Sequence, residues 1–295
     1  MRLFATLLAI AALALASCGP KPAPAVQPEP ALWRITDADS EIWLYGTVHV
    51  LPPNLHWRGP RFEHAFNGSG ELVLETDAGP QNQAEFVSLA QRNGTLPPGE
   101  TLSAKLDPAA RAQLTRVAAS AHIDPARLEH DRPWLAALKL SVGYVVAHGE
   151  AADAGVETAL AADAQHRGMR VSFMETPEQQ ILTLADLQPA DETQFLIASM
   201  RQIEEESGDI DAMNQAWARG DTNTLQRMLD AQLREAGPAA YDALITRRNA
   251  IWADDITRRL NGSGRVFIAV GAAHLLGPDS VVALLRSRGV QVEGP

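Results

Sequence analysis

Two stretches of the chain, IWLYGTVH at residues 42–49 and VFIAVGAAH at residues 266–274, decide how it folds. Each begins with a run of β-branched, aliphatic and aromatic residues, which predicts a short buried strand. Each run then leads into Gly-x-x-His, so we expect His49 and His274 just past the carboxyl ends of two strands. Ligands bind at these ends in open α/β sheets. The repeated motif therefore predicts one site that both histidines help to build.

Two further strand candidates end on acidic residues in the same way. ELVLET places Glu75 after a buried run, and VSFMET places Glu175 after another. The two acids and the two histidines are thus expected to converge at one edge of the sheet. Each acid also has a simpler explanation. Glu75 can cap the turn that begins at Thr76, and Glu175 precedes Thr176-Pro177, a typical helix start.

The amino terminus reads as an export signal. Arg2 precedes the apolar run LFATLLAIAALALAS, and Leu15-Ala16-Ser17-Cys18 resembles the lipobox of bacterial lipoproteins. This match predicts a signal peptide over residues 1–17 and an acylated Cys18 that attaches the mature chain to a membrane. Residues 18–30 contain five prolines and predict a semi-rigid tether. An ordinary cleaved signal with an incidental cysteine is the alternative.

Residues 31–295 remain for a folded domain, and 46% hydrophobic residues in the chain supply an ample core. Cys18 is the single cysteine, so the domain is expected to lack disulfides and thiolate metal ligands. The net charge of −11 disfavours nucleic acid as a partner. Composition therefore leaves enzymes and binding modules with small-molecule or peptide ligands as the open classes.

The order of the elements predicts an α/β fold with a mostly parallel sheet and a large helical insertion or cap. Strand candidates lie at both ends of residues 31–295, and helix-forming residues dominate from Pro108 to Leu260. VSFMET interrupts the helical part and ties it back to the sheet, although a separate all-helical domain is the alternative. We expect a two-helix hairpin over residues 215–234, with Asp221 as an N-cap, and one long helix over residues 238–260.

The predicted convergence has the chemistry of a metal site. Two imidazoles and one carboxylate form the ligand set that catalytic zinc and related divalent ions use, with a position left for water. Glu75 is the expected carboxylate, since sequential strands are usually neighbours. Glu175 is then a second ligand or the general base that takes a proton from bound water. Two strand-end histidines with purely structural roles are the alternative.

A second polar group, formed by Arg247, Arg248 and Asn249, lies inside the long predicted helix. A guanidinium aimed at the site can hold a substrate carboxylate or stabilise an oxyanion. Adjacent arginines point in different directions on a helix, so we expect Arg248 alone to reach the site, as a catalytic and substrate-binding residue. Asn249 is expected to bind substrate beside it. Ion pairs with Asp254 or Asp255 on a solvated face are the alternative.

The assembled segments resemble the TraB/GumN family, which is related to the animal Tiki metalloproteases. The resemblance covers nearly all of residues 31–295 and implies a fold similar to erythromycin esterases and ChaN-type proteins. It also implies that His49, Glu75 and His274 hold a divalent metal ion, with manganese, cobalt or zinc as candidates. Glu157 stands where the family often has an aspartate. The segments that carry the resemblance are Trp33, IWLYGTVHVLPP, ELVLET, RPW, AGVETALAADAQHRG, FMETPEQQ, RRNAIWADDI and VGAAHLLGPDSVVALLRSRGVQV.

The resemblance implies a reaction as well. Tiki relatives cleave peptides with a divalent metal, TraB relatives limit peptide pheromone signalling, and GumN-type members are associated with polysaccharide gene clusters. We therefore expect a metal-dependent hydrolase, first of all a peptidase. Gly19 lacks the acidic side chain that favours inner-membrane retention, which predicts the outer membrane, facing the periplasm. A non-catalytic peptide-binding lipoprotein and a metal-independent esterase acting on a carbohydrate or small ester are the alternatives.

Overall fold

A six-stranded sheet lies at the centre of the computed structural model, in the order β4-β3-β5-β2-β1-β6. The structure describes residues 29–48, 51, 55–77, 79, 82–148, 155–205 and 209–295. β2, β5, β3 and β4 are parallel to one another, and β1 runs antiparallel to its neighbours β2 and β6. The expected α/β fold with a mostly parallel sheet is confirmed. The strands are β1 (Leu32–Thr36), β2 (Ser40–Thr47), β3 (Glu71–Leu74), β4 (Arg170–Phe173), β5 (Gly264–Gly271) and β6 (Val292–Glu293).

The two Gly-x-x-His segments lie on neighbouring strands. β2 and β5 pair along their whole length, and Thr47 is opposite Gly271 at their carboxyl ends. β3 pairs with the other side of β5, which brings the end of ELVL to the same edge. The two similar motifs are therefore also neighbours in space, because the segments that follow β2 and β5 leave the sheet side by side.

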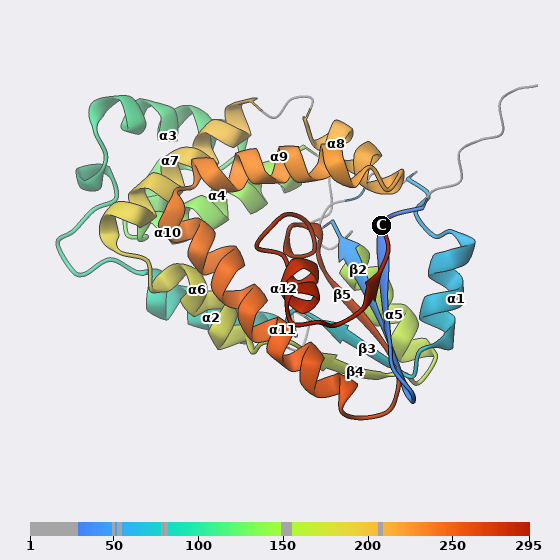
Figure 1. Ribbon diagram of the computed structural model, residues 1–295. Coiled ribbons are helices and arrows are strands. Elements are labelled where there is room, and N and C mark those ends of the chain that lie inside the picture. Colours follow the sequence, from blue (N-terminus) through green and yellow to red (C-terminus); the bar gives the residue numbers. More distant parts are fainter. Residues whose placement is uncertain are drawn as a thin grey trace, which may run out of the picture.

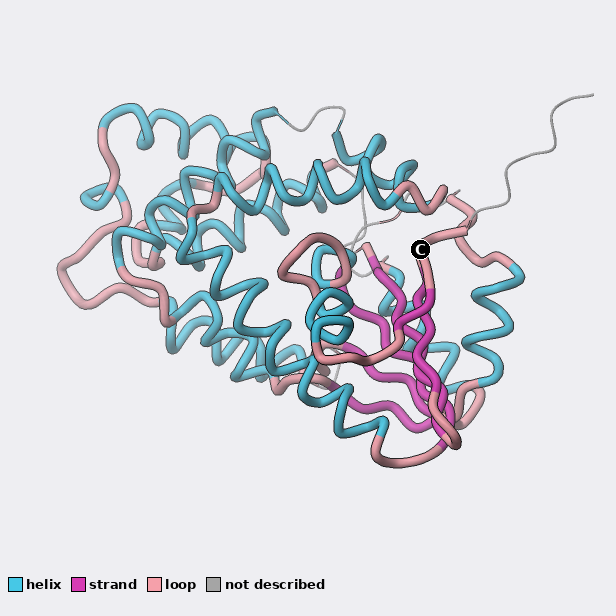
Figure 2. The backbone as a smooth tube through the Cα atoms, viewed as in Figure 1, coloured by secondary structure: helices cyan, strands magenta, loops and turns pink. Residues whose placement is uncertain are grey.

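Helices cover both faces of the sheet (Figures 1 and 2). On one face, α1 (Pro60–Gly68) and α5 (Val156–His166) pack against the alternate strand residues that include Tyr45 and Phe267. On the other face, α11 (Arg247–Leu260) and α12 (Val281–Ser287) pack against the remaining strand residues. Apolar side chains thus alternate between two cores, as the pleat of a buried sheet requires.

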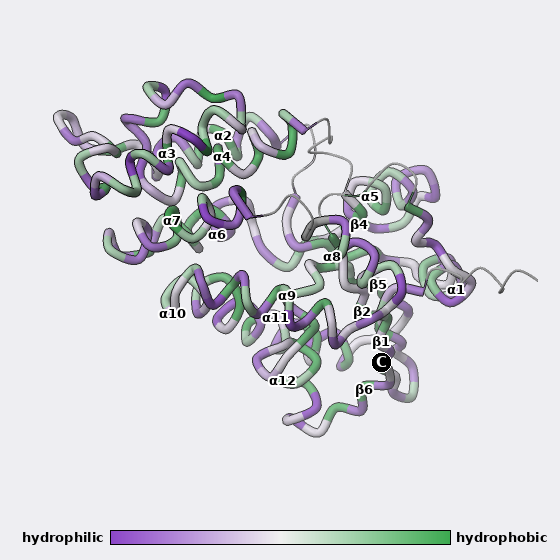
Figure 3. Tube along the Cα trace, turned by 90° about the horizontal axis from the view of Figure 1, so that it is seen from above, coloured by the Kyte–Doolittle hydropathy of each residue, from purple (hydrophilic) through white to green (hydrophobic). Residues whose placement is uncertain are grey.

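The long helical insertion gathers at one side of the sheet (Figure 3). Three clusters of its buried side chains lie between its own helices, and their described members include no strand residue. Two helices, α8 and α9, form the expected hairpin and contact the sheet, where Trp217 donates a hydrogen bond to the Gly46 carbonyl (2.7 Å). The helices are α2 (Gln83–Gly94), α3 (Pro108–Ser120), α4 (Pro133–Ala147), α6 (Pro177–Ala185), α7 (Pro189–Glu205), α8 (Asp209–Ala218), α9 (Thr222–Glu235) and α10 (Pro238–Tyr241).

Local sequence explains most helix starts. Asp107 and Asp221 accept hydrogen bonds as N-caps of α3 and α9, and Thr176 forms a capping box at the start of α6. The long helix expected over residues 238–260 has the predicted bounds but is not α-helical throughout. It consists of α10, a π-helical turn at Asp242–Thr246, and α11.

The predicted signal peptide at residues 1–17, the acylated Cys18 and most of the tether lie outside the described residues. The described chain begins at Glu29, whose backbone N–H donates to the Ala218 carbonyl at the end of α8 (2.9 Å). None of the helices described is both long enough and apolar enough to span a bilayer. Membrane attachment through Cys18 stays a prediction.

Candidate functional site

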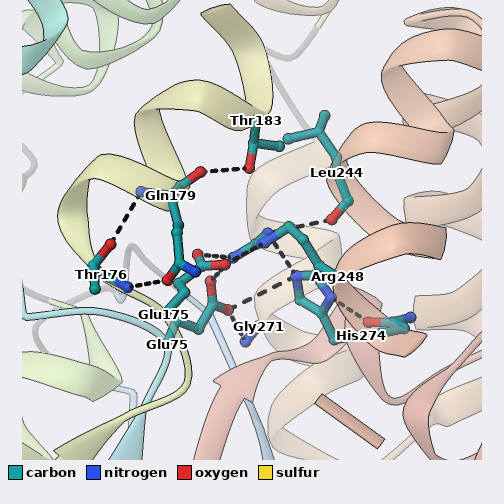
Figure 4. Close-up of polar contacts among 10 residues, drawn as sticks. Glu75, Glu175, Thr176, Gln179, Thr183, Leu244, Arg248, Gly271 and His274 are labelled. Carbon is teal, nitrogen blue, oxygen red and sulfur yellow. Dashed lines mark hydrogen bonds and ion pairs between the residues drawn. The ribbon is translucent and has the colours of Figure 1, made fainter. Parts of the chain in front are cut away.

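Four of the predicted residues come together where β3 and β5 end (Figure 4). Glu75 follows β3, Glu175 follows β4, Arg248 projects from α11, and His274 ends a short 3-10 turn after β5. His49, the other predicted histidine ligand, lies outside the described residues. The carboxyl edge of the sheet and the first turn of α11 therefore build a single polar centre.

Arg248 is the hub of this centre. Its guanidinium binds Glu175 through two hydrogen bonds, Nη2 to Oε1 (2.6 Å) and Nε to Oε2 (3.1 Å). Nη2 also donates to Oε2 of Glu75 (2.8 Å). The remaining Nη1 donates to the Leu244 carbonyl (3.2 Å) and lies 3.1 Å from Nε2 of His274. The rigid fork of an arginine fits such planar carboxylate contacts, so Arg248 fixes both acids relative to one another.

Glu75 reaches across to β5. Its Oε1 accepts a hydrogen bond from the backbone N–H of Gly271 (2.6 Å) and lies 3.9 Å from Nε2 of His274. Glu175 likewise turns away from the helix that follows, since Thr176 and Gln179 cap α6 by themselves. Among the described residues, the side-chain contacts of both acids lead into the centre, and those of Glu175 do not include α6.

His274 is held from behind by two residues of α11. Its Nδ1 lies 2.6 Å from Oδ1 of Asn249, whose Nδ2 donates to the Asp279 carbonyl (2.7 Å). Its ring stacks obliquely on Trp252, with the centroids 4.4 Å apart, and Arg248 lies over the same indole at 4.6 Å. Asn249 is fully buried. Its contacts support a role in orienting His274, whereas substrate binding was the expectation from the sequence.

A π-helical turn precedes this part of α11. In Asp242–Thr246 the backbone is wound more widely, and the Arg247 N–H bonds to the carbonyl of Asp242, five residues back. Such turns are rare and occur frequently at functional sites. Here the turn brings the Leu244 carbonyl against the Arg248 side chain.

The described residues of the centre include two carboxylates and one guanidinium. Glu75 and Glu175 both bind Arg248, and the three side chains are at most 12% exposed. Burial raises the pKa of the Glu175 carboxyl, and the negative charge of Glu75 raises it further, although Arg248 opposes both. Among the described residues, therefore, one buried guanidinium serves two carboxylates.

The described donors fit a divalent metal ion in type. Nε2 of His274 and Oε1 of Glu75 are 3.9 Å apart, and Nη1 of Arg248 faces the same Nε2. To hold an ion at about 2.0–2.2 Å from each atom in tetrahedral geometry, these side chains would have to move closer together. Within the described part of the chain, no three histidine, cysteine, aspartate or glutamate side chains form a metal-binding group. The third ligand expected from the sequence, His49, is not among those residues.

Arg247 points away from the centre, whereas Glu157 lies at the same carboxyl edge of the sheet. Arg247 pairs with Asp242 on the surface (3.0 Å), as expected for the neighbour of an inward-facing arginine. Glu157, at the start of α5, accepts a hydrogen bond from the Thr47 hydroxyl at the end of β2. Asp254 and Asp255 pair with other arginines, so neither binds Arg248.

Sequence reasoning missed two members of the centre. Trp252 forms the floor beneath His274 and Arg248, and the Gly271 N–H anchors Glu75. Trp252 had a readable signal, because residues four apart share a helix face and Trp252 follows Arg248 at that spacing. A backbone N–H leaves no signal in the residue types.

Comparison with known proteins identifies the family. The profile of the TraB/PrgY/gumN family matches residues 31–294. The chain belongs to the TraB/PrgY/gumN family. An uncharacterized protein from Treponema pallidum (strain Nichols) is 23% identical to it over 281 residues, which cover 88% of this chain and 81% of the relative. No solved structure matches the chain significantly. The resemblance drawn from the sequence is thereby confirmed at the level of the family.

Proposed function

We propose that this TraB/PrgY/gumN protein is a metal-dependent hydrolase that acts on peptides. The observation that carries the proposal is the convergence of His274, Glu75, Glu175 and Arg248 at the carboxyl edge of the sheet. A buried acid with a raised pKa, such as Glu175, beside an imidazole is typical of acid–base catalysis. The match to the TraB/PrgY/gumN family shows the family alone. The hydrolytic activity, the bound metal ion and the peptide substrate are what we propose.

In this proposal His49, Glu75 and His274 hold the metal ion, which when bound supplies an activated water and polarises the scissile carbonyl. Glu175 takes the proton from the attacking water and returns it to the leaving amine. Its raised pKa suits this task, because a base works best when its pKa lies near the working pH. Arg248 holds Glu175 in place and compensates charge as the oxyanion forms.

The decisive experiment measures metal content and peptide cleavage on the same preparation. Full-length protein in detergent is analysed for bound manganese, cobalt and zinc, and is incubated with a peptide library before and after treatment with a chelator. We expect bound metal and cleavage that the chelator abolishes and added metal restores. Chelator-insensitive turnover of ester substrates would favour the metal-independent esterase, and tight peptide binding without turnover would favour a sequestering lipoprotein.

Variants locate the metal within the protein. His49→Ala and His274→Ala are each expected to abolish bound metal and cleavage, because a three-ligand site does not survive the loss of one ligand. His148→Ala is the matched control, since His148 lies at the end of α4 and its ring bonds the Tyr144 carbonyl. Full metal content in both site variants would overturn the proposed metal centre.

We also propose that Cys18 anchors the protein to the outer membrane, facing the periplasm. Cys18→Ser is expected to yield a soluble or unprocessed product, because the chain has no second cysteine to take the lipid. Membrane fractionation with labelled lipid measures this. Equal retention and labelling of the variant would show that the motif at residues 15–18 is not a lipobox.

A further inference from the structure

A chain of three hydrogen bonds runs behind His274, on the side away from the carboxylates. Tyr241 at the end of α10 donates to Oδ2 of Asp279 (3.0 Å). The backbone carbonyl of Asp279 accepts from Nδ2 of Asn249 (2.7 Å), and Oδ1 of Asn249 lies 2.6 Å from Nδ1 of His274. The chain therefore connects α10, α11 and the loop that carries His274.

The carbonyl of Asp279 fixes which way the Asn249 amide faces. A carbonyl oxygen only accepts, so the amide nitrogen must face Asp279 and the amide oxygen must face the imidazole. An amide oxygen also only accepts, and Nδ1 of His274 must therefore carry a proton.

Arg248 gives the same answer from the opposite side of the ring. Its Nη1 lies 3.1 Å from Nε2 of His274, and a guanidinium has donors only. Nε2 must accept, so it carries a lone pair and no proton. Asn249 and Arg248 thus specify one neutral tautomer, with Nδ1 protonated and the Nε2 lone pair facing Nη1 of Arg248.

We propose that Asn249 is a positioning residue, which holds His274 as the Nδ1–H tautomer so that Nε2 can act as ligand or acceptor in the site. This inference rests on the proposed function for its consequence, metal binding, and on geometry alone for the tautomer. Metal-ligating histidines commonly donate their second N–H to such a partner, and its loss costs roughly 10–100-fold in metal affinity. Complete burial of Asn249 means that it acts through His274 and not on a substrate.

The test combines a spectroscopic readout with a metal titration on full-length protein in detergent. Histidine is labelled with ¹⁵N, and the His274 signals are assigned by their loss in His274→Ala. We expect Nε2 to give the signal of an unprotonated ring nitrogen in the wild type. In Asn249→Leu the ring loses the acceptor that holds it, and Oε1 of Glu75, 3.9 Å from Nε2, can accept a proton from that nitrogen if the ring turns away from Arg248. We therefore expect Nε2 to become protonated in part of the molecules, and Mn²⁺ affinity to fall about 10–100-fold by calorimetry.

Two further variants separate positioning from general damage. Asn249→Asp keeps an accepting oxygen and is expected to restore the wild-type tautomer signal. Asn214→Leu is the burial control, because Asn214 is 3% exposed and its amide nitrogen has no hydrogen-bond partner among the described residues. If Asn249→Leu does not fold, Asn249→Ser takes its place, since its hydroxyl is too short to reach Nδ1.

The outcomes distinguish this inference from the proposed function. An unchanged His274 signal in Asn249→Leu, with Mn²⁺ affinity within about twofold of Asn214→Leu, would overturn the positioning role. Failure of the wild type to bind Mn²⁺ or Zn²⁺ would overturn the metal proposal, while the tautomer comparison would still decide the role of Asn249.

Discussion

β3 begins and ends beside a buried glutamate that binds an arginine of α11, and the two ends differ in charge. At the amino end, Glu71 accepts hydrogen bonds from Arg259 (3.0 Å) and Ser172 (2.6 Å) and also pairs with Arg170. At the carboxyl end, Glu75 accepts from Arg248 (2.8 Å). The same strand and the same helix thus build two superficially similar ion-pair clusters.

Arginines outnumber acids in the described amino-end cluster. Arg259 also binds Asp255 (2.7 Å), which pairs with Arg258 as well (2.8 Å), so Glu71 and Asp255 face three arginines among the described residues. Although burial acts to raise it, the pKa of Glu71 is lowered overall by the hydrogen bonds from Ser172, Arg170 and Arg259. This cluster is a structural tie between β3, β4 and α11.

The carboxyl-end cluster differs in its described contacts. Two acids there share one arginine, Arg248, and burial raises the pKa of Glu175. A buried carboxylate with a raised pKa is typical of a catalytic site, whereas a carboxylate with a lowered pKa and several donors is typical of a structural ion pair.

The largest expected effect comes from Glu175→Gln. Glutamine keeps the size of the side chain but cannot accept a proton, so cleavage should slow by about 10²–10⁴-fold while bound metal is retained. Rate and metal content measured on one preparation check this. Glu71→Gln is the matched control and should keep both. If Glu175→Gln cleaved peptides within about twofold of the wild-type rate, the cluster around Glu175 would have a structural role, like the cluster around Glu71.

The second largest effect is expected from Arg248→Met, which should lower the free energy of unfolding. It leaves two buried carboxylates without their shared cation, and breaking a buried pair typically costs about 3–5 kcal/mol. The cost should be greatest near neutral pH and shrink toward acid, because protonation of the carboxyls removes the repulsion. Urea denaturation at several pH values measures it. Arg247→Met, which alters a surface pair only, should change the free energy of unfolding by about 1 kcal/mol or less.

Much of this centre was predictable because parallel strands end at a common edge. Continuous apolar runs bounded by turn residues placed Glu75 and His274 at strand ends, and helix geometry implied that only one of Arg247 and Arg248 faces the site, which is Arg248. These inferences need only the apolar runs and the helical repeat. They required no knowledge of which side chains finally touch.

The rest depended on tertiary geometry. The π-helical turn at Asp242–Thr246 has no sequence signature, and one helix was expected across it. Asn249 looked like a ligand-binding residue because its type and neighbours suggest one. Its burial is set by the packing of α11 on the loop after β5, which the sequence alone does not give.

The two glutamates should respond oppositely to pH. The lowered pKa of Glu71 means that its contribution to stability is present at neutral pH and is lost as pH falls through the folded pKa. Glu71→Gln should therefore cost about 1.5–3 kcal/mol near pH 7 and less in acid, as for hydrogen bonds to a charged group. The raised pKa of Glu175 means that its ionisation opposes folding. Relative to wild type, Glu175→Gln should gain stability as pH rises from acid to neutral. The free energy of unfolding of each variant is measured by urea denaturation at several pH values. If its difference from wild type changed with pH in the same direction for both variants, the predicted opposite response would be wrong.

The smallest expected effect tests whether the amino-end cluster depends on burial. The Arg170 side chain is 73% exposed, whereas that of Arg259 is 21% exposed, although both bind Glu71. Exposed ion pairs contribute about 0–1 kcal/mol, because water screens them and ordering the side chain costs entropy. Arg170→Ala should accordingly lower the free energy of unfolding by no more than about 1 kcal/mol, and Arg259→Ala by more, since it leaves both Glu71 and Asp255 with one partner fewer. If both variants lowered the free energy of unfolding equally, Arg170 would stabilise Glu71 as much as the less exposed Arg259 does. The number of less exposed partners would then not explain why the two ends of β3 differ.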